Sequence, residues 1–213
     1  MKEYYITSEK GQGELVEKKS RFIAHVIPIS SEEEALTLIE GLKKEYWDAR
    51  HNCYAFVLGA NNEVQRFSDD GEPQGTAGKP ILEVLINKDV HNTLILVTRY
   101  FGGTLLGTGG LIRAYGGAAL EGLKDAEIMI MSDGVSFDLV VDYESIGKIK
   151  YNMVQFGVGD AREVYGEDVT LKISMKKDDF EKFKTSVIDA TSGKAKFDNI
   201  SECEYREKAK LDG

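Results

Sequence analysis

Apolar and polar positions follow two different periods at the start of the chain. In ELVEKKSRFIAHVIPI (residues 14–29) apolar residues recur at alternate positions, which predicts two strand-like runs. In SSEEEALTLIEGLKKEY (residues 30–46) they recur at helical spacing instead, behind a serine and three acidic residues. A helix is therefore expected here, with Ser30 or Ser31 as its N-cap.

The next segments predict a hairpin, a long loop and a helix. NCYAFVLGA (residues 52–60) and EVQRF (residues 63–67) flank an Asn-Asn turn and form the hairpin. SDDGEPQGTAGKP (residues 68–80) is the loop. Because proline is tolerated only in the first turn of a helix, Pro80 implies that the next helix begins within residues 76–79.

A buried strand and a second helix complete this half of the chain. NTLILVTRYF (residues 92–101) is nearly continuous in apolar residues, so it is expected to be buried on both faces. A glycine-rich stretch then leads into GLIRAYGGAALEGLKDAE (residues 110–127), which predicts a helix.

The pattern restarts after residue 127. The predicted elements are a strand (135–142), a helix (143–157), two strands around Gly166, a helix (178–191) and a strand (194–206). The order βαββαβ is that of a ferredoxin-like domain. The fold class is therefore predicted as α+β, with one domain over residues 1–127 and a ferredoxin-like domain over residues 128–213.

Charge and apolar content indicate which cellular compartment and which kinds of partner are expected. The 213 residues carry a formal charge of −9 spread along the chain, which does not favour non-specific nucleic-acid binding, although a local basic groove stays open as an alternative. The N-terminus lacks an apolar core typical of a signal peptide, and no run approaches the ~20 apolar residues of a membrane span. Cys53 and Cys203 form no metal or disulfide pattern, so we expect buried thiols in the cytoplasm.

Seven glycines crowd residues 102–117. The phosphate-binding P-loop pattern fails because Thr108 stands where lysine is needed, and the dinucleotide-binding pattern fails at Ile112. A strand, a glycine loop and a helix N-terminus remain, and such a terminus suits an anion. We assign Gly102, Gly103, Gly107 and Gly109 to a functional or turn-forming loop, and Gly110, Gly116 and Gly117 to close helix packing.

Arginines and aromatic residues flank this loop. Arg99 and Arg113 offer planar donor forks that match phosphate or carboxylate, and Tyr100, Phe101 and Tyr115 could stack a base or ring. The alternative is that Phe101 belongs to the core and that one arginine pairs with an acidic residue of the 68–80 loop.

The 68–80 loop offers acidic residues and a second helix start. Asp69, Asp70 and Glu72 miss the calcium-loop pattern, and we predict no metal site and no cofactor. Thr76 and Gly78 mark a helix entrance with free N–H groups. If both helix starts open on the same side, they converge on one polar pocket that awaits an anion.

No catalytic constellation stands out in the sequence. His51 and Cys53 lie two positions apart on a predicted strand, a geometry that rarely suits a nucleophile pair. The common serine-hydrolase and zinc-protease motifs are absent. We therefore predict no catalytic residue.

The segments HNCYAFVLG, SDDGEPQGTAGKP and VTRYFGGTLLGTGGLIRAYG closely resemble the signature of the YigZ/IMPACT family. The resemblance implies an N-terminal α/β sandwich like the second domain of ribosomal small-subunit protein five, a fold shared with the fourth domain of elongation factor G and the GHMP kinases. It also implies a C-terminal domain like the fifth domain of elongation factor G. The binding surface that it implies comprises His51, Asn52, Asp69, Asp70, Gly71, Glu72, Pro73, Thr76, Gly78, Arg99, Tyr100, Gly102, Gly103, Gly107, Gly110 and Arg113.

The resemblance also sets the expected function. Eukaryotic IMPACT proteins restrain a kinase that acts on a translation initiation factor, alongside an N-terminal RWD domain. No such segment precedes the signature here, so that role is not expected to carry over intact. The expectation is a non-enzymatic cytoplasmic protein that contacts RNA, the ribosome or a translation-related protein. The alternatives are a binder or enzyme of a phosphorylated small molecule or nucleotide at the glycine loop, and a protein-interaction module.

Overall fold

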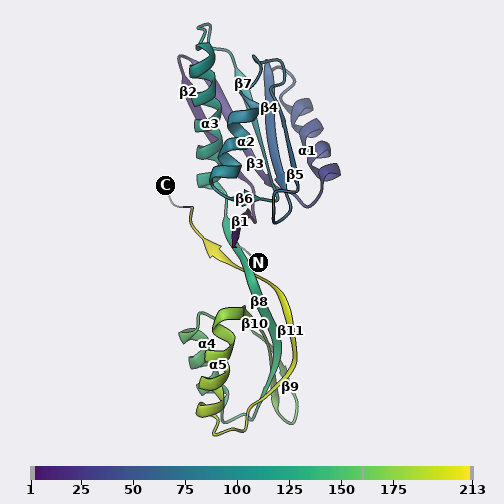
Figure 1. Cartoon of the computed structure of the whole chain (residues 1–213), viewed down its shortest axis with the longest axis vertical. Coiled ribbons are helices and arrows are strands. Elements are labelled where there is room, and N and C mark those ends of the chain that lie inside the picture. Colours follow the sequence, from purple (N-terminus) through teal and green to yellow (C-terminus); the bar gives the residue numbers. More distant parts are fainter. Residues whose placement is uncertain (1–2, 160, 212–213) are drawn as a thin grey trace. The chain divides into compact units, whose positions relative to one another are not determined.

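The computed structural model describes residues 3–159 and 161–211, and it contains two compact units (Figure 1). The first unit comprises residues 4–130 together with residues 207–211. The second comprises residue 3 and residues 131–206 as far as they are described. The strands form two sheets, so the architecture is a mixed α+β fold.

The first unit is built on a five-stranded sheet in the order β2-β3-β7-β4-β5, in which all neighbouring strands are antiparallel. These strands are β2 (Gly11–Glu17), β3 (Ser20–Pro28), β4 (His51–Leu58), β5 (Val64–Ser68) and β7 (Thr93–Tyr100). The hairpin of β4 and β5 and the central, two-sided burial of β7 are confirmed. A short parallel pair, β1 (Tyr4–Thr7) and β6 (Val90–His91), was not predicted.

Helices cover both faces of this sheet (Figure 1). Helix α1 (Glu32–Glu45) packs on one face, and α2 (Gly78–Asn87) and α3 (Gly107–Asp125) lie side by side on the other. Ser31 caps α1, because its hydroxyl accepts the Glu34 N–H at 3.1 Å. Because helices cover both faces of the sheet, successive β3 residues are buried against opposite helix layers, Val26 toward α3 and Ile27 toward α1.

Helix α3 approaches β2 very closely. A Cβ added to Gly13 would lie 2.3 Å from the Gly122 backbone nitrogen, so only glycine fits at this crossing. The packing glycines expected on α3 are only partly those observed. A Cβ at Gly117 would meet Leu15 at 2.8 Å, whereas one at Gly116 would meet only Val84 at 4.0 Å.

The second unit has the element order βαββαβ. Its strands β8 (Ile128–Val141), β9 (Arg162–Tyr165), β10 (Val169–Lys176) and β11 (Lys196–Ala209) pair in the order β11-β8-β10-β9. Helices α4 (Ile146–Gln155) and α5 (Lys177–Ala190) contribute Ile149, Phe180 and Phe183 to its apolar core. Strand β8 begins seven residues before the expected start. The earlier part was missed because Gly134 interrupts the apolar pattern, although this glycine packs closely against Tyr205 within the strand.

No helix within the described residues is long and apolar enough to cross a membrane.

Candidate functional site

The loop after β5 folds back on the start of α2 through Asp69. The Asp69 carboxylate accepts the backbone N–H groups of Gly75 (2.7 Å), Ala77 (3.0 Å) and Gly78 (2.9 Å). Gly78 is the first residue of α2 and Ala77 is its N-cap, so the carboxylate occupies the start of this helix. The prediction that Thr76 and Gly78 form a helix entrance open to an anion is therefore wrong, because the chain's own carboxylate occupies it.

Asp70 fastens the same loop to β4. Its carboxylate accepts the Asn52 N–H at 2.7 Å and the Lys43 ammonium at 2.5 Å. Its carbonyl oxygen lies 2.8 Å from His51 Nδ1. Gly71 follows with φ +86°, a conformation that favours glycine. Asp69 and Asp70 thus hold the loop in place rather than facing solvent as ligands.

Glu72 reaches under the glycine loop and forms a buried cluster. Its carboxylate accepts hydrogen bonds from Arg99 Nη1 at 2.5 Å and from the Tyr115 hydroxyl at 2.8 Å, and it lies 3.9 Å from His51 Nε2. The side chains of Glu72 and Arg99 are only 4% and 6% exposed. The alternative that one arginine pairs with an acid of this loop is confirmed. Glu72 and Arg99 therefore neutralise each other in the interior of the unit.

Tyr115 cannot stack a ligand. Its ring is fully buried and meets Phe22 edge-on at 5.0 Å. Burial also raises the pKa of its hydroxyl far above the ordinary tyrosine value, so the group stays a hydrogen-bond donor. The prediction of a stacking role for Tyr115 is wrong, because the apolar face of α3 carries it into the core.

The glycines of the 102–110 segment have different reasons to be glycine. A Cβ at Gly102 would lie 2.1 Å from the Lys19 carbonyl carbon, so Gly102 is a packing residue rather than a loop residue open to a ligand. Gly103 and Gly107 have φ of +84° and +71° with open space around them. Helix α3 already begins at Gly107, so Gly109 and Gly110 lie in its first turn.

The two motif segments meet at a hollow of about 350 Å³. Its walls include the Glu72–Arg99 pair, and the start of α3 at Gly107 and Thr108 borders it. It is lined by Arg50, His51, Gly71, Glu72, Pro73, Arg99, Phe101, Leu105, Leu106, Gly107, Thr108 and Leu111.

Two exposed residues of this hollow, Arg50 and Leu105, were not among the predicted site residues, whereas Phe101 was predicted as a stacking residue with a core position as the alternative. Phe101 is 40% exposed and Leu105 84% exposed, so the expectation of a core position for Phe101 is wrong. The Arg50 guanidinium lies 5.7 Å from the Phe101 ring centroid. Arg50 directly precedes the HNCY motif, which was the available signal, and Leu105 lies inside the glycine stretch.

Two residues of the predicted binding surface, Tyr100 and Arg113, lie beside the hollow rather than in its lining. The Tyr100 hydroxyl donates to Asp48 Oδ1 at 3.0 Å, and Arg21 lies 6.0 Å from its ring centroid. Arg113 is exposed on α3, and a Cβ added to Gly109 would lie 3.6 Å from its guanidinium. Both side chains face outward, beside the hollow rather than within its lining.

His51 and Cys53 each bond a loop carbonyl. Cys53 Sγ lies 3.0 Å from the Asp69 carbonyl oxygen, and the residue is fully buried. Burial raises the pKa of the Cys53 thiol well above its ordinary value, so it stays protonated at neutral pH. This environment suits a structural cysteine and not a nucleophile.

Fold and site together define a two-unit α+β protein with a motif-lined hollow in its first unit. A family model described as Impact N-terminal domain matches residues 18–123, and the Domain of unknown function DUF1949 matches residues 139–194. The chain is 39% identical to the IMPACT family member YvyE of Bacillus subtilis over 208 residues, covering 97% of this chain and 94% of that protein. The chain belongs to the IMPACT family.

Two further comparisons agree. The IMPACT family member YigZ of Escherichia coli is 35% identical over 178 residues, which cover 83% of this chain and 87% of that protein. The crystal structure of a hypothetical protein is 32% identical with a TM-score of 0.59, covering 94% of this chain and 98% of the other. Both matches extend over most of the chain, so they include parts of both units.

Proposed function

We propose that this protein is a binding protein of the translation apparatus that contacts RNA at the hollow between its two motif segments. One observation carries the proposal. Among the exposed side chains at this hollow are a guanidinium and an aromatic ring in contact, Arg50 and Phe101, and its one lining carboxylate, Glu72, is neutralised by Arg99.

This combination has the chemistry of single-stranded RNA recognition. Unpaired bases stack on aromatic rings and arginine planes, and phosphates pair with arginine. The N-terminus of α3 at Gly107 adds partial positive charge beside the same hollow. The link to translation rests on the family resemblance.

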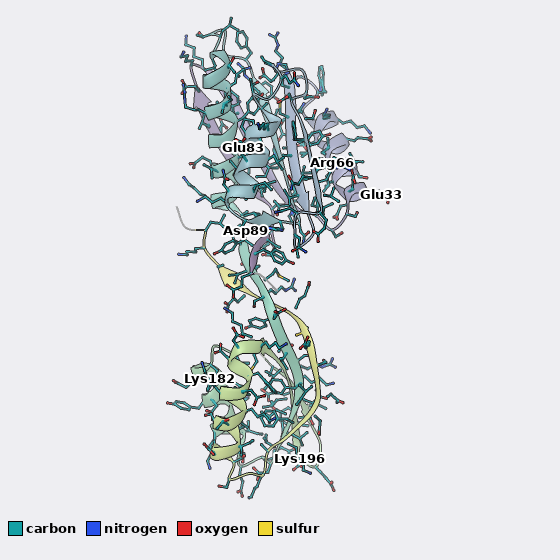
Figure 2. All side chains as sticks on the ribbon, in the orientation of Figure 1. Glu33, Arg66, Glu83, Asp89, Lys182 and Lys196 are labelled. Carbon is teal, nitrogen blue, oxygen red and sulfur yellow. The ribbon has the colours of Figure 1, made fainter. Side chains whose placement is uncertain are left out.

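The test is co-sedimentation with ribosomes over a series of salt concentrations. Arg50→Glu and Arg113→Glu should each weaken binding about tenfold and flatten its salt dependence, because each removes a phosphate contact. Arg99 is unsuitable for this purpose, because its reversal would break the buried pair with Glu72. Arg66→Glu is the matched control: Arg66 is exposed on β5, where Figure 2 labels it, and bonds Glu32 at 3.0 Å.

Two outcomes would contradict the proposal. One is a wild-type protein that never co-sediments at low salt, and the other is an equal loss in Arg66→Glu. Partners that survive nuclease treatment in a pull-down would instead favour a protein-interaction module.

A second candidate is binding of a phosphorylated small molecule. A volume of about 350 Å³ is within the range of ligand pockets, and the start of α3 borders it. A thermal-shift panel of nucleotides and sugar phosphates tests this candidate, since a ligand at ~100 times its Kd adds about 2.7 kcal/mol to stability. No shift across the panel would exclude it.

We also propose the finer fold assignments. The strand order β11-β8-β10-β9 supports a ferredoxin-like domain after residue 127. The first unit, with helices on both faces of an antiparallel sheet, supports a domain like the second domain of ribosomal small-subunit protein five.

A further inference from the structure

A second hollow lies at the opposite end of α3 from the glycine loop. Its volume is about 800 Å³, and it is bordered by the ends of α2 and α3, the start of β8 and residues 208–211, all around the first unit. Leu120, Leu123, Ile128 and Leu211 contribute its apolar walls. Asp89, labelled in Figure 2, lies in the turn between α2 and β6 near this end of the unit.

The charges around these apolar walls are unusual for this chain. Four lysines and a single carboxylate, Glu127, line the hollow, although the whole protein carries −9. Lys88 and Lys124 sit at the C-terminal ends of α2 and α3, where a cation offsets the partial negative charge of the helix carbonyls.

Helix ends do not account for the other two lysines. Lys208 and Lys210 come from the end of β11 and the residue after it. Lys208 pairs with Glu127, and Lys124 pairs with Glu121 at 2.6 Å. Lys210 is exposed and adds a further cation beside the apolar residues.

We propose that this hollow binds one amphiphilic anion, a straight-chain fatty acid. The hydrocarbon chain lies against Leu120, Leu123 and Ile128, and the carboxylate pairs with Lys124 and Lys210. A neutral apolar ligand would make no use of the lysines, and a nucleotide would leave its polar groups unpaired against leucine. The volume lies within the range of small-molecule sites.

The test is calorimetric titration of the full chain with sodium dodecanoate below its micelle concentration. We expect one site, and binding that strengthens about fourfold for each methylene added between octanoate and dodecanoate. Dodecanol should bind more weakly than dodecanoate, and dodecyltrimethylammonium more weakly still, because both lack the charge that the lysines select.

Charge-reversal variants locate the site. Lys124→Glu and Lys210→Glu should each weaken dodecanoate binding about three- to fivefold, with dodecanol unaffected. Leu120→Asp should abolish binding of both. Lys182→Glu is the matched control: Lys182, labelled on α5 in Figure 2, is similarly exposed and also forms an i,i+3 pair, with Asp179 at 3.9 Å.

The outcomes separate cleanly, since circular dichroism reports whether each variant folds. Absence of dodecanoate binding overturns the proposal, as does equal binding of the cationic detergent or an equal effect of Lys182→Glu. Binding to phosphatidylglycerol vesicles without binding of the free acid would also overturn it. Ribosome co-sedimentation is independent of these results, because the two hollows lie at opposite ends of α3.

Discussion

Within the described residues, the first unit buries a charged pair in its interior, whereas the buried polar side chains of the second unit are uncharged. The first unit buries Asn52, Thr98 and Arg99 beside its apolar core, each tied to another polar group. The second unit also buries uncharged polar groups such as Asn152, and its apolar core is rich in phenyl rings, with Phe137 lying 5.0 Å from Phe180 and 6.0 Å from Phe183. Helices cover both faces of the five-stranded sheet in the first unit. In the second unit the apolar core lies on the helix side of the strands, and Lys172 and Asp138 form an ion pair on the opposite, exposed side.

This difference is consistent with the binding role that we propose for the first unit. Apolar residues of similar volume often stabilise a core as well as a buried ion pair does, so stability alone gives little reason to keep Glu72 and Arg99 inside. In this structure the pair joins the loop that carries Glu72 to the end of β7 and lines a hollow.

The largest expected effect tests this contrast directly. Glu72→Ala leaves the Arg99 guanidinium and the Tyr115 hydroxyl buried without their acceptor, so we expect a loss of about 3–5 kcal/mol in the free energy of unfolding. Urea denaturation measures the loss, and hydrogen exchange assigns it to the first unit. Glu72→Gln, which keeps one acceptor oxygen, should lose less.

Glu163→Ala is the matched control in the second unit. Glu163 pairs with Lys150 at 2.8 Å near the surface, where water replaces the lost partner. Its effect should be far smaller, and equal losses in the two variants would refute the contrast between the units.

The next effect concerns the cap of α2. Asp69→Ala frees three N–H groups in a partly buried loop, which we expect to cost about 2 kcal/mol and to loosen residues 70–78. Exchange rates of the Gly75, Ala77 and Gly78 amides measure the loosening. Asp142→Ala removes the single hydrogen bond to the Ser145 N–H before α4 and should have a smaller effect. The prediction would be contradicted if Asp142→Ala speeds exchange near α4 while Asp69→Ala leaves the Gly75, Ala77 and Gly78 amides unchanged.

The smallest effect is a pH dependence confined to the first unit. Burial lowers the pKa of His25, despite the opposing charge of Glu45, so the unfolded state takes up this proton more readily. Stability of the first unit should therefore fall as pH drops from about 7.5 to about 5.5, through the unfolded histidine pKa near 6.5. Thermal unfolding of His25→Gln should show a shallower decline.

The second unit supplies the comparison for this measurement too. All three histidines, His25, His51 and His91, belong to the first unit. Carboxylates with lowered pKa, such as Glu163, titrate below this range. A second unit whose hydrogen-exchange stability declines as much as that of the first would show that His25 is not the cause.

Local pattern in the sequence was enough to determine most elements and the motif segments. The Ser31 cap, the β4–β5 hairpin and the helix start near Pro80 depend on neighbouring residues alone, so reading the chain predicted them. The short pair β1–β6 lacked such a signal, because it depends on a partner more than 80 residues away.

Tertiary structure decided which motif residues face solvent. The sequence identified Glu72, Arg99 and Tyr115 as candidate site residues. Only the fold shows that their side chains are buried, whereas Phe101 and Arg50 are exposed. The same holds for the helix entrance at Gly78, which Asp69 fills from nine residues away. A side chain's exposure depends on what the rest of the chain packs against it, and a one-dimensional pattern does not contain that information.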